Sequence, residues 1–206
     1  MVGLVVPFGS SALAAYSLTQ RLPQFFAGFG SGGISQAAGV VVGQSLGAGQ
    51  PQRAKTTVWW AAGIALSING CFAIMMMVFP GPFLSIFTRD PQLLGEAAPW
   101  LQILAMTLFG MSLGMVFSQC LNTAGETLLP MIVVVSSNWL IQQPLAIMLS
   151  GARSNWEVLG QTVHLPTLAH WDEFGICWAI VIAQVTRPLT YFPYLKWGPW
   201  LKKQVL

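Results

Sequence analysis

Charge is almost absent from four long stretches of this 206-residue chain, and that absence limits its fold more than any motif does. The four uncharged intervals are Arg21 to Arg53, Lys55 to Arg89, Glu96 to Glu126, and Glu126 to Arg153. A helix needs about 20 apolar residues to cross the hydrocarbon core of a membrane, and each interval is longer than that. Charged residues make up 7% of the chain, against about 25% in an ordinary globular domain. The sequence therefore predicts an all-α integral membrane protein, with residues 1–206 forming a single membrane domain.

Five transmembrane helices and part of another are expected. Their approximate bounds are 22–46, 58–80, 98–120, 128–149 and 175–195. Residues 2–8 look like the end of a further span whose beginning is absent. Turn residues set the boundaries: "FPGPF" should end the second span, and Pro130 suits the first turn of the fourth, where a missing N–H is harmless. The fifth span is the weakest prediction because it contains Arg187 and Pro188.

The segment 151–173 is the one long polar loop, and we expect it on the outer side of the membrane. It holds both histidines, and His164 and His170 with Asp172 could bind a metal, although a solvated loop is the favoured interpretation. Placing the turn near Arg53 in the cytoplasm also places the lysine-rich C-terminus there, as the excess of Lys and Arg in cytoplasmic loops requires. The basic residues are not clustered on a solvated surface, so no nucleic-acid partner is expected.

No Asp, Glu or His lies inside a confidently predicted span, which argues against an intramembrane protease and against enzymes generally. The segment "GFGSGG" fits the dinucleotide pattern G-x-G-x-x-G but lies inside an apolar helix, so the match is accidental. Glycines four residues apart, such as Gly28 with Gly32 and Gly110 with Gly114, favour close helix packing. No cofactor is expected.

Neutral amides are the main polar groups inside the spans. Buried in lipid they would be costly, so they should hydrogen-bond between helices or line a wet pathway. The candidate cavity-lining residues are Gln36, Asn69, Gln102, Gln119 and Asn138. Phe25, Phe26 and methionines could supply adaptable apolar contacts beside them.

The segment "VVGQSLGAGQPQRAKTT" resembles the cytoplasmic connection after the eighth helix of multidrug and toxic compound extrusion (MATE) transporters. Further matches follow in the family's order: "FGSSALAAYSLTQRLPQF", "FLSIFTRDPQLLGEAAPWLQI", "LNTAGETLLPMIVVVSSNWLIQQPLAIML" and "GICWAIVIAQVTRPL". Together they cover nearly the whole chain, and 151–173 matches least. The residues that match the cytoplasmic-turn motif are Gly43, Gln44, Gly47, Ala48, Gly49, Arg53 and Ala54. In this family they turn the chain at the membrane face, so no phosphate site is implied.

The resemblance implies the C-terminal half of a twelve-helix fold. The whole protein would export drugs and other amphipathic organic compounds, often cationic, across the bacterial inner (plasma) membrane by alternating access, in exchange for Na⁺ or H⁺. Its partners would be membrane lipid and an N-terminal lobe, covalent or separate. The equivalent of helix ten carries no acid here, so a coupling carboxylate would belong to the other half. Two alternatives remain: a lipid or lipid-precursor flippase of related architecture, and a non-transporting truncated fragment that needs an N-lobe partner.

Overall fold

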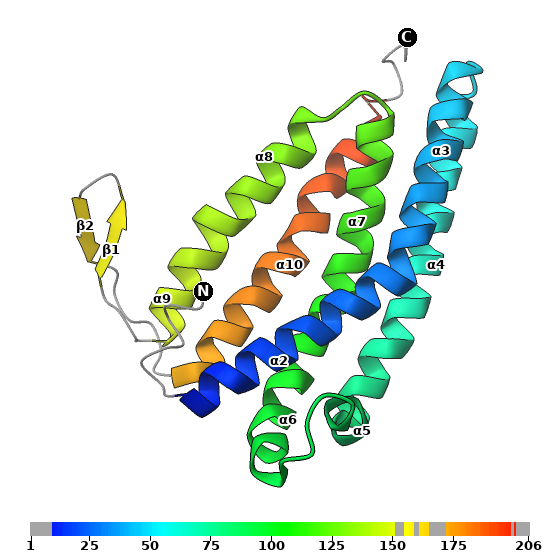
Figure 1. Ribbon diagram of the computed structural model, residues 1–206. Coiled ribbons are helices and arrows are strands. Elements are labelled where there is room, and N and C mark those ends of the chain that lie inside the picture. Colours follow the sequence, from blue (N-terminus) through cyan, green and yellow to red (C-terminus); the bar gives the residue numbers. More distant parts are fainter. Residues whose placement is uncertain (1–9, 151–154, 159–160, 165–171, 199, 201–206) are drawn as a thin grey trace.

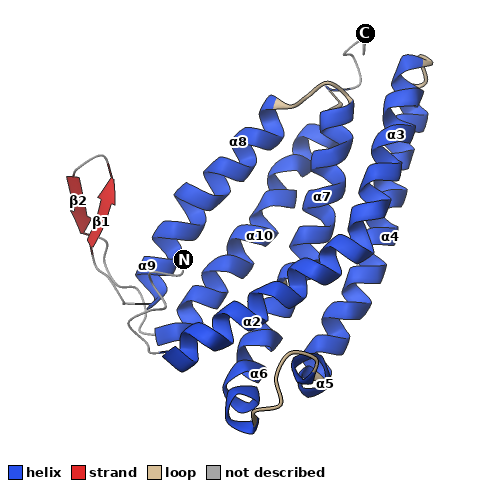
Figure 2. Ribbon diagram, viewed as in Figure 1, coloured by secondary structure: helices blue, strands red, loops and turns tan. Residues whose placement is uncertain are grey.

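The computed structural model describes residues 10–150, 155–158, 161–164, 172–198 and 200, and these are helical apart from one small hairpin (Figures 1 and 2). The first half contains α2 (Ser10–Ala27), the π-helical segment η2 (Gly28–Gly32), α3 (Gly33–Gly47), α4 (Pro51–Val78) and α5 (Pro80–Ser85). The second half contains α6 (Pro91–Ala105), α7 (Thr107–Thr123), α8 (Leu128–Ser136), the π-helical segment η3 (Ser137–Gln142), α9 (Gln143–Ser150), β1 (Asn155–Val158), β2 (Gln161–His164) and α10 (Asp172–Trp197).

The long helices run up and down the molecule as an open bundle. Figure 1 shows the α3–α4 turn, the α7–α8 turn and the C-terminal end of α10 at one end of the bundle. A hydrogen bond links two of these features directly, because Lys55 Nζ at the start of α4 donates to the carbonyl of Lys196 at 3.4 Å. Connections that lie at one end in this way are what alternating membrane crossings produce.

Two turns at this end share one mechanism for stopping a helix. At the end of α3, Gly49 has φ +68°, and the N–H groups of Gly49 and Gln50 donate to the carbonyls of Leu46 and Ser45. At the end of α7, Gly125 has φ +80° and the same two bonds reach Asn122 and Leu121. A glycine in the left-handed region followed by this pair of bonds is the Schellman motif. The glycine-rich stretch therefore contains a helix stop at Gly49, and Pro51 opens the next helix at a position where its missing N–H costs nothing.

Among the described residues, three helices satisfy the length and hydropathy of a membrane span: Leu13–Gly47, Pro51–Val78 and Leu128–Leu149. A fourth becomes possible if α6 and α7, which are bent by 40°, count as one. The end of the second span at "FPGPF" and the place of Pro130 in the first turn of α8 are confirmed. The long, apolar α10 covers the predicted 175–195 but does not reach the hydropathy of the other three.

The first predicted span was wrong at its beginning. The helix is continuous from Ser10 to Gly47, so Arg21 lies within it rather than before it. A single arginine does not end a helix, since its propensity for helix is high and its long side chain is exposed here. The predicted partial span at 2–8 lies outside the described residues.

The predicted span 98–120 is broken into two helices. The predicted loop 151–173 contains a short hairpin. The break falls at Met106, where the Thr107 hydroxyl donates to the carbonyl of Leu104 and competes with the helical ladder. In the loop, β1 and β2 pair antiparallel, with Asn155 opposite His164 and Val158 opposite Gln161. Four-residue strands carry too weak a pattern to be seen among polar residues.

Pro144 marks the second π-helical segment. Proline has no N–H for the carbonyl four residues earlier, so the ladder must rearrange around it. Here the turns just before it widen into η3, Ser137–Gln142. This rearrangement brings Asn138 to the side of η3 that contacts α10.

Close helix packing occurs at some of the predicted glycines and not at others. A Cβ on Gly110 would lie 2.4 Å from the carbonyl oxygen of Gln184, so α7 and α10 cross there almost backbone to backbone. Gly114, Gly28 and Gly32 have no such neighbour, and for these the packing prediction was wrong. In the helix from Ser10 to Gly47, Gly39, which is four residues from Gly43, does pack, with a Cβ position 3.0 Å from Thr123 Cγ2 on α7. Gly30 also packs, against Asn69 Oδ1, although it lies outside the four-residue spacing. The four-residue spacing predicted a stripe of glycines on one helix face. The widened π turn of η2 changes which glycine of this helix faces α4.

Candidate functional site

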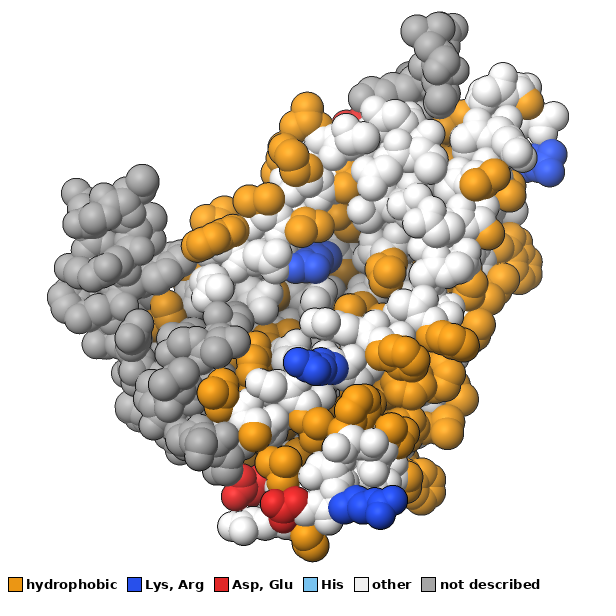
Figure 3. Space-filling view, viewed as in Figure 1, with side chains coloured by type: hydrophobic (Ala, Val, Ile, Leu, Met, Phe, Trp, Pro, Cys, Tyr) orange, Lys and Arg blue, Asp and Glu red, His pale blue; other side chains and the backbone are white. Residues whose placement is uncertain are grey.

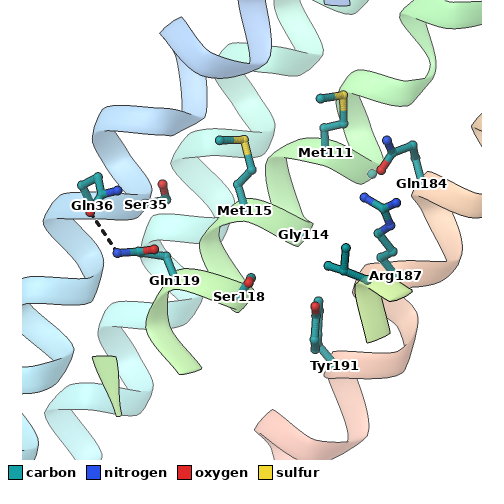
Figure 4. Close-up of a pocket in the computed structure, with 12 residues that line it drawn as sticks. Ser35, Gln36, Met111, Gly114, Met115, Ser118, Gln119, Gln184, Arg187 and Tyr191 are labelled. Atoms are coloured by element: carbon teal, nitrogen blue, oxygen red, sulfur yellow. Dashed lines mark hydrogen bonds between the residues drawn. The ribbon is translucent and has the colours of Figure 1, made fainter. Parts of the chain in front are cut away.

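Four helices enclose a polar pocket of about 270 Å³ (Figure 4). It lies between α3, α7, α8 and α10. Its described lining residues are Ser35, Gln36, Gly110, Met111, Gly114, Met115, Ser118, Gln119, Val134, Gln184, Arg187 and Tyr191. Figure 3 shows that one face of the molecule is hollowed and that a basic side chain lies in the hollow.

Helix α7 forms the floor of the pocket. Met111, Gly114, Met115 and Ser118 recur at intervals of three and four residues, which places them on one helix face. The glycine leaves open space, because nothing lies within 4 Å of where its Cβ would be. The two methionines give this floor an adaptable apolar surface.

Two glutamines close the α3 side of the pocket. Gln119 Nε2 on α7 donates to Gln36 Oε1 on α3 at 2.9 Å, as the dashed line in Figure 4 shows. Ser35 lies next to this pair and is buried, with its hydroxyl donating to the carbonyl of Gly32 at 2.8 Å. The pair therefore ties two helices together while its remaining polar atoms face the pocket.

Helix α10 supplies the opposite wall through Gln184, Arg187 and Tyr191, which follow the same helical spacing. Arg187 donates from Nη2 to Asn138 Oδ1 on η3, whereas its Nε is buried and has no hydrogen-bond partner among the described residues. The Tyr191 hydroxyl donates to the carbonyl of Pro130 at 3.4 Å and so links α10 to the start of α8.

Arg187 carries the only charge among the described lining residues, and none of them is acidic. A charge at membrane depth is expensive and normally faces a partner or a water-filled cavity. Asn138 is a neutral partner, so it accepts a hydrogen bond without cancelling the charge. The pocket thus has a net positive charge within an otherwise neutral, amide- and thioether-rich lining.

The predicted cavity residues are in three different situations. Gln36 and Gln119 line the pocket, and Asn138 contacts it through Arg187. Asn69 is fully buried against Gly30, and neither of its side-chain polar atoms has a partner in the described part of the chain. Gln102 is exposed and donates to the carbonyl of Met77 at 3.0 Å.

The remaining predictions lie away from the pocket. The cytoplasmic-turn residues surround the α3–α4 turn: Gly43, Gln44 and Gly47 end α3, Ala48 and Gly49 form the turn, and Arg53 and Ala54 open α4. Phe26 packs against Phe72 with ring centroids 4.8 Å apart.

No group of three or more His, Cys, Asp or Glu in the described ranges could hold a metal ion. The proposed metal group is outside this test, since His170 and the side chains of His164 and Asp172 are not described.

Sequence reasoning did not select Gly114, Ser35 or Tyr191 as site residues, and it expected Arg187 to face a cavity or a partner if its span is real. The missed pattern was the run of small and methionine residues along one face of α7. Such a pattern is equally typical of helix packing, so only the neighbouring helices reveal that it borders an opening.

A second cavity of about 410 Å³ lies on another side of α7 and is almost wholly apolar. Trp59, Leu66, Phe109, Phe117, Leu189 and Phe192 are among the residues that line it. Gly110 lines both cavities, so the tight crossing of α7 and α10 separates them.

Comparisons with known proteins give the fold and the family. The MatE family model matches residues 1–148. The chain is 28% identical over 145 residues to the uncharacterized transporter YisQ of Bacillus subtilis, an alignment that covers 67% of this chain and 30% of that protein. It is 27% identical over 174 residues to the probable multidrug resistance protein NorM of Thermotoga maritima, covering 84% and 34% respectively.

A solved structure agrees with this assignment. The outward-facing conformation of a multidrug resistance MATE family transporter of the MOP superfamily superposes with a TM-score of 0.77 and 20% sequence identity. The match covers 95% of this chain and 40% of that one. The chain therefore has part of the MATE fold, and it spans about a third of the length of the curated relatives that it matches.

Proposed function

Since the chain belongs to the MatE family of membrane transporters, we propose that it forms the C-terminal lobe of a cation-coupled antiporter. The whole protein would exchange Na⁺ or H⁺ for drugs and other amphipathic organic compounds. It would do so by alternating access across the bacterial inner membrane, with its C-terminus in the cytoplasm.

The polar pocket is the observation that carries this proposal. It lies in the hollowed face of an otherwise apolar bundle, and helices from both ends of the chain line it. Transporters hold substrates near the middle of the membrane between two repeats, where irregular or π-helical backbone can line a cavity. A lobe with a half-open pocket supports a function in which a second lobe completes the site.

Five membrane crossings are part of the proposal. Helix α10 has 26 residues, which at 1.5 Å per residue is about 39 Å, longer than a bilayer core of about 30 Å. It packs against α7, α9 and η3, so it belongs to the same bundle as the apolar helices. With α6 and α7 as one bent crossing, the chain alternates sides and places Arg53 and Lys196 at the same face.

Transport by the protein at its natural length tests the proposal. The protein would be isolated from its own membranes through an antibody to the C-terminal tail, its intact mass compared with the 22.3 kDa of this chain, and the sample reconstituted into vesicles. We expect an imposed Na⁺ or H⁺ gradient to drive movement of an amphipathic organic dye, tested with the cationic rhodamine 6G and with the anionic fluorescein. Gradient-independent movement of a fluorescent lipid instead of the dye would favour the flippase. No movement of either compound, at a mass of 22.3 kDa, would favour the fragment that needs a partner.

A matched pair of variants ties transport to the pocket. Gly114→Trp places an indole in the open space over α7, so we expect dye movement to fall at least tenfold. Gly95→Trp is the control, because Gly95 also has open space around it but lies on α6, outside both the polar pocket and the apolar cavity. Equal rates in the two variants would remove this pocket from the transport pathway.

A further inference from the structure

We propose that the polar pocket selects compounds carrying an anionic group, a carboxylate or a phosphate, and that Arg187 is the residue that binds this group. The inference rests on the proposed transport function and narrows its substrate class. It also departs from the cationic compounds that the family resemblance suggests, because the pocket's own charge is positive.

A hydrogen bond holds the guanidinium of Arg187 in place and, within the described part of the chain, leaves other N–H donors of the group free. Its Nη2 donates to Asn138, and Figure 4 shows the group extending from α10 toward Gln184, with Met111 nearby. A guanidinium has five N–H donors in a fixed fork that matches a carboxylate or phosphate. One of these, on Nε, is buried without a partner among the described residues. Within the same residues, the bond from Nη2 to Asn138 is the one that engages the other donors, so N–H groups on Nη1 and Nη2 remain for a ligand.

Nothing in the described lining cancels the charge. The other polar lining side chains are neutral amides, serines and a tyrosine. A positive charge at membrane depth is stabilised by an opposite charge that enters with the ligand, since the ion pair then forms where water is scarce. A cationic compound in the same place would meet repulsion from Arg187 and no attracting carboxylate on this lobe.

The remainder of the lining suits the apolar part of such a compound. Met111 and Met115 offer flexible thioether surfaces, and Val134 adds an aliphatic contact on α8. Gln36 and Gln119 on the far wall can accept or donate hydrogen bonds to neutral polar substituents. The ligand class that fits is therefore an amphipathic organic anion, with its charge at α10 and its apolar body across α7.

Binding of two dyes of opposite charge tests the inference on the purified full-length transporter in detergent. Fluorescein and rhodamine 6G share a xanthene core, but the first is anionic and the second cationic. Their affinities are measured by fluorescence anisotropy for the natural protein and for Arg187→Gln. We expect fluorescein to bind the variant about tenfold or more weakly, as for a lost hydrogen bond to a charged group. Rhodamine 6G should bind it more tightly, because a repelling charge is gone.

Two further variants separate recognition from a structural role. Arg187→Lys keeps the charge and should recover most of the fluorescein affinity, although it loses the planar fork. Arg89→Gln removes an exposed positive charge from the α5–α6 connection and should change neither affinity.

The results that would overturn the inference are distinct from a failure of the transport proposal. If Arg187→Gln weakened the binding of both dyes equally, Arg187 would have a structural role. Unchanged fluorescein affinity would show that Arg187 does not bind the anionic group. Failure of fluorescein to bind the natural protein while rhodamine 6G is still transported would reject anion selection and leave the transport function standing.

Discussion

At the scale of single residues, two asparagines that look alike in the sequence have opposite surroundings. Asn138 accepts a hydrogen bond from Arg187, whereas Asn69 is fully buried with both polar atoms unpartnered in the described part of the chain. Composition alone predicts that such amides are buried or line a cavity. It cannot say which, because helix facing depends on where η2 and η3 widen the helices.

Asn138→Leu should therefore destabilise the protein, whereas Asn69→Leu should not. Loss of the Asn138 acceptor leaves the guanidinium without its described partner, and we expect a cost of roughly 1–3 kcal/mol. Asn69→Leu removes an unsatisfied buried amide at similar volume, so it should be neutral or stabilising.

Thermal unfolding of the two variants in the same detergent measures the difference. If Asn69→Leu destabilised the protein as much as Asn138→Leu, the Asn69 amide would have a partner that the described residues do not include.

At the scale of helices, the spacing of small residues was a good guide to contact and a poor guide to which residue makes it. Gly110 and Gly114 both belong to the predicted stripe, but only Gly110 lies against the backbone of α10. The apolar intervals and the turns at Gly49 and "FPGPF" could be predicted because each depends on a few adjacent residues. The bend at Met106, the hairpin and the long first helix depend on tertiary packing or on weak local patterns, and the sequence did not indicate them.

Gly110→Ala should weaken the α7–α10 crossing, since its Cβ would lie 2.4 Å from a backbone oxygen that cannot turn aside. The expected cost is roughly 1–3 kcal/mol, as for other overpacked sites. Gly114→Ala has open space and should gain up to about 1 kcal/mol from helix propensity. Unfolding midpoints of the two alanine variants, compared with the natural protein, check the prediction. Similar midpoints would show that the helices separate easily at this point.

At the scale of the whole molecule, the turns alternate between the two ends of the bundle. This alternation predicts the side of the membrane from which each turn can be reached. Gln52 lies in the first turn of α4, at the end of the bundle that holds the C-terminal end of α10. Gln92 lies in the first turn of α6, at the other end of the bundle. Both side chains are exposed. The uncharged intervals and the basic residues in the sequence predict this order of crossings. The sequence could not predict the pocket, which needs four helices from distant parts of the chain to come together.

Single cysteines at these positions should react from opposite sides of the membrane. In a background with Cys71, Cys120 and Cys177 replaced, Gln52→Cys should react with an impermeant maleimide only in inside-out vesicles. Gln92→Cys should react only in intact cells. Labelling of both positions from one side would contradict the alternating topology.

The position of Arg187 near the middle of α10 also has an electrical consequence. Moving one elementary charge through a membrane potential of 100 mV changes its energy by about 2.3 kcal/mol. A lobe that rocks between two orientations would carry this fixed charge through part of the field whenever the pocket is empty. A bound anion would neutralise it, so voltage would act mainly on the return step, in which an antiporter carries its coupling cation and this pocket holds no anion. The resting potential of the cell would then help to drive that return.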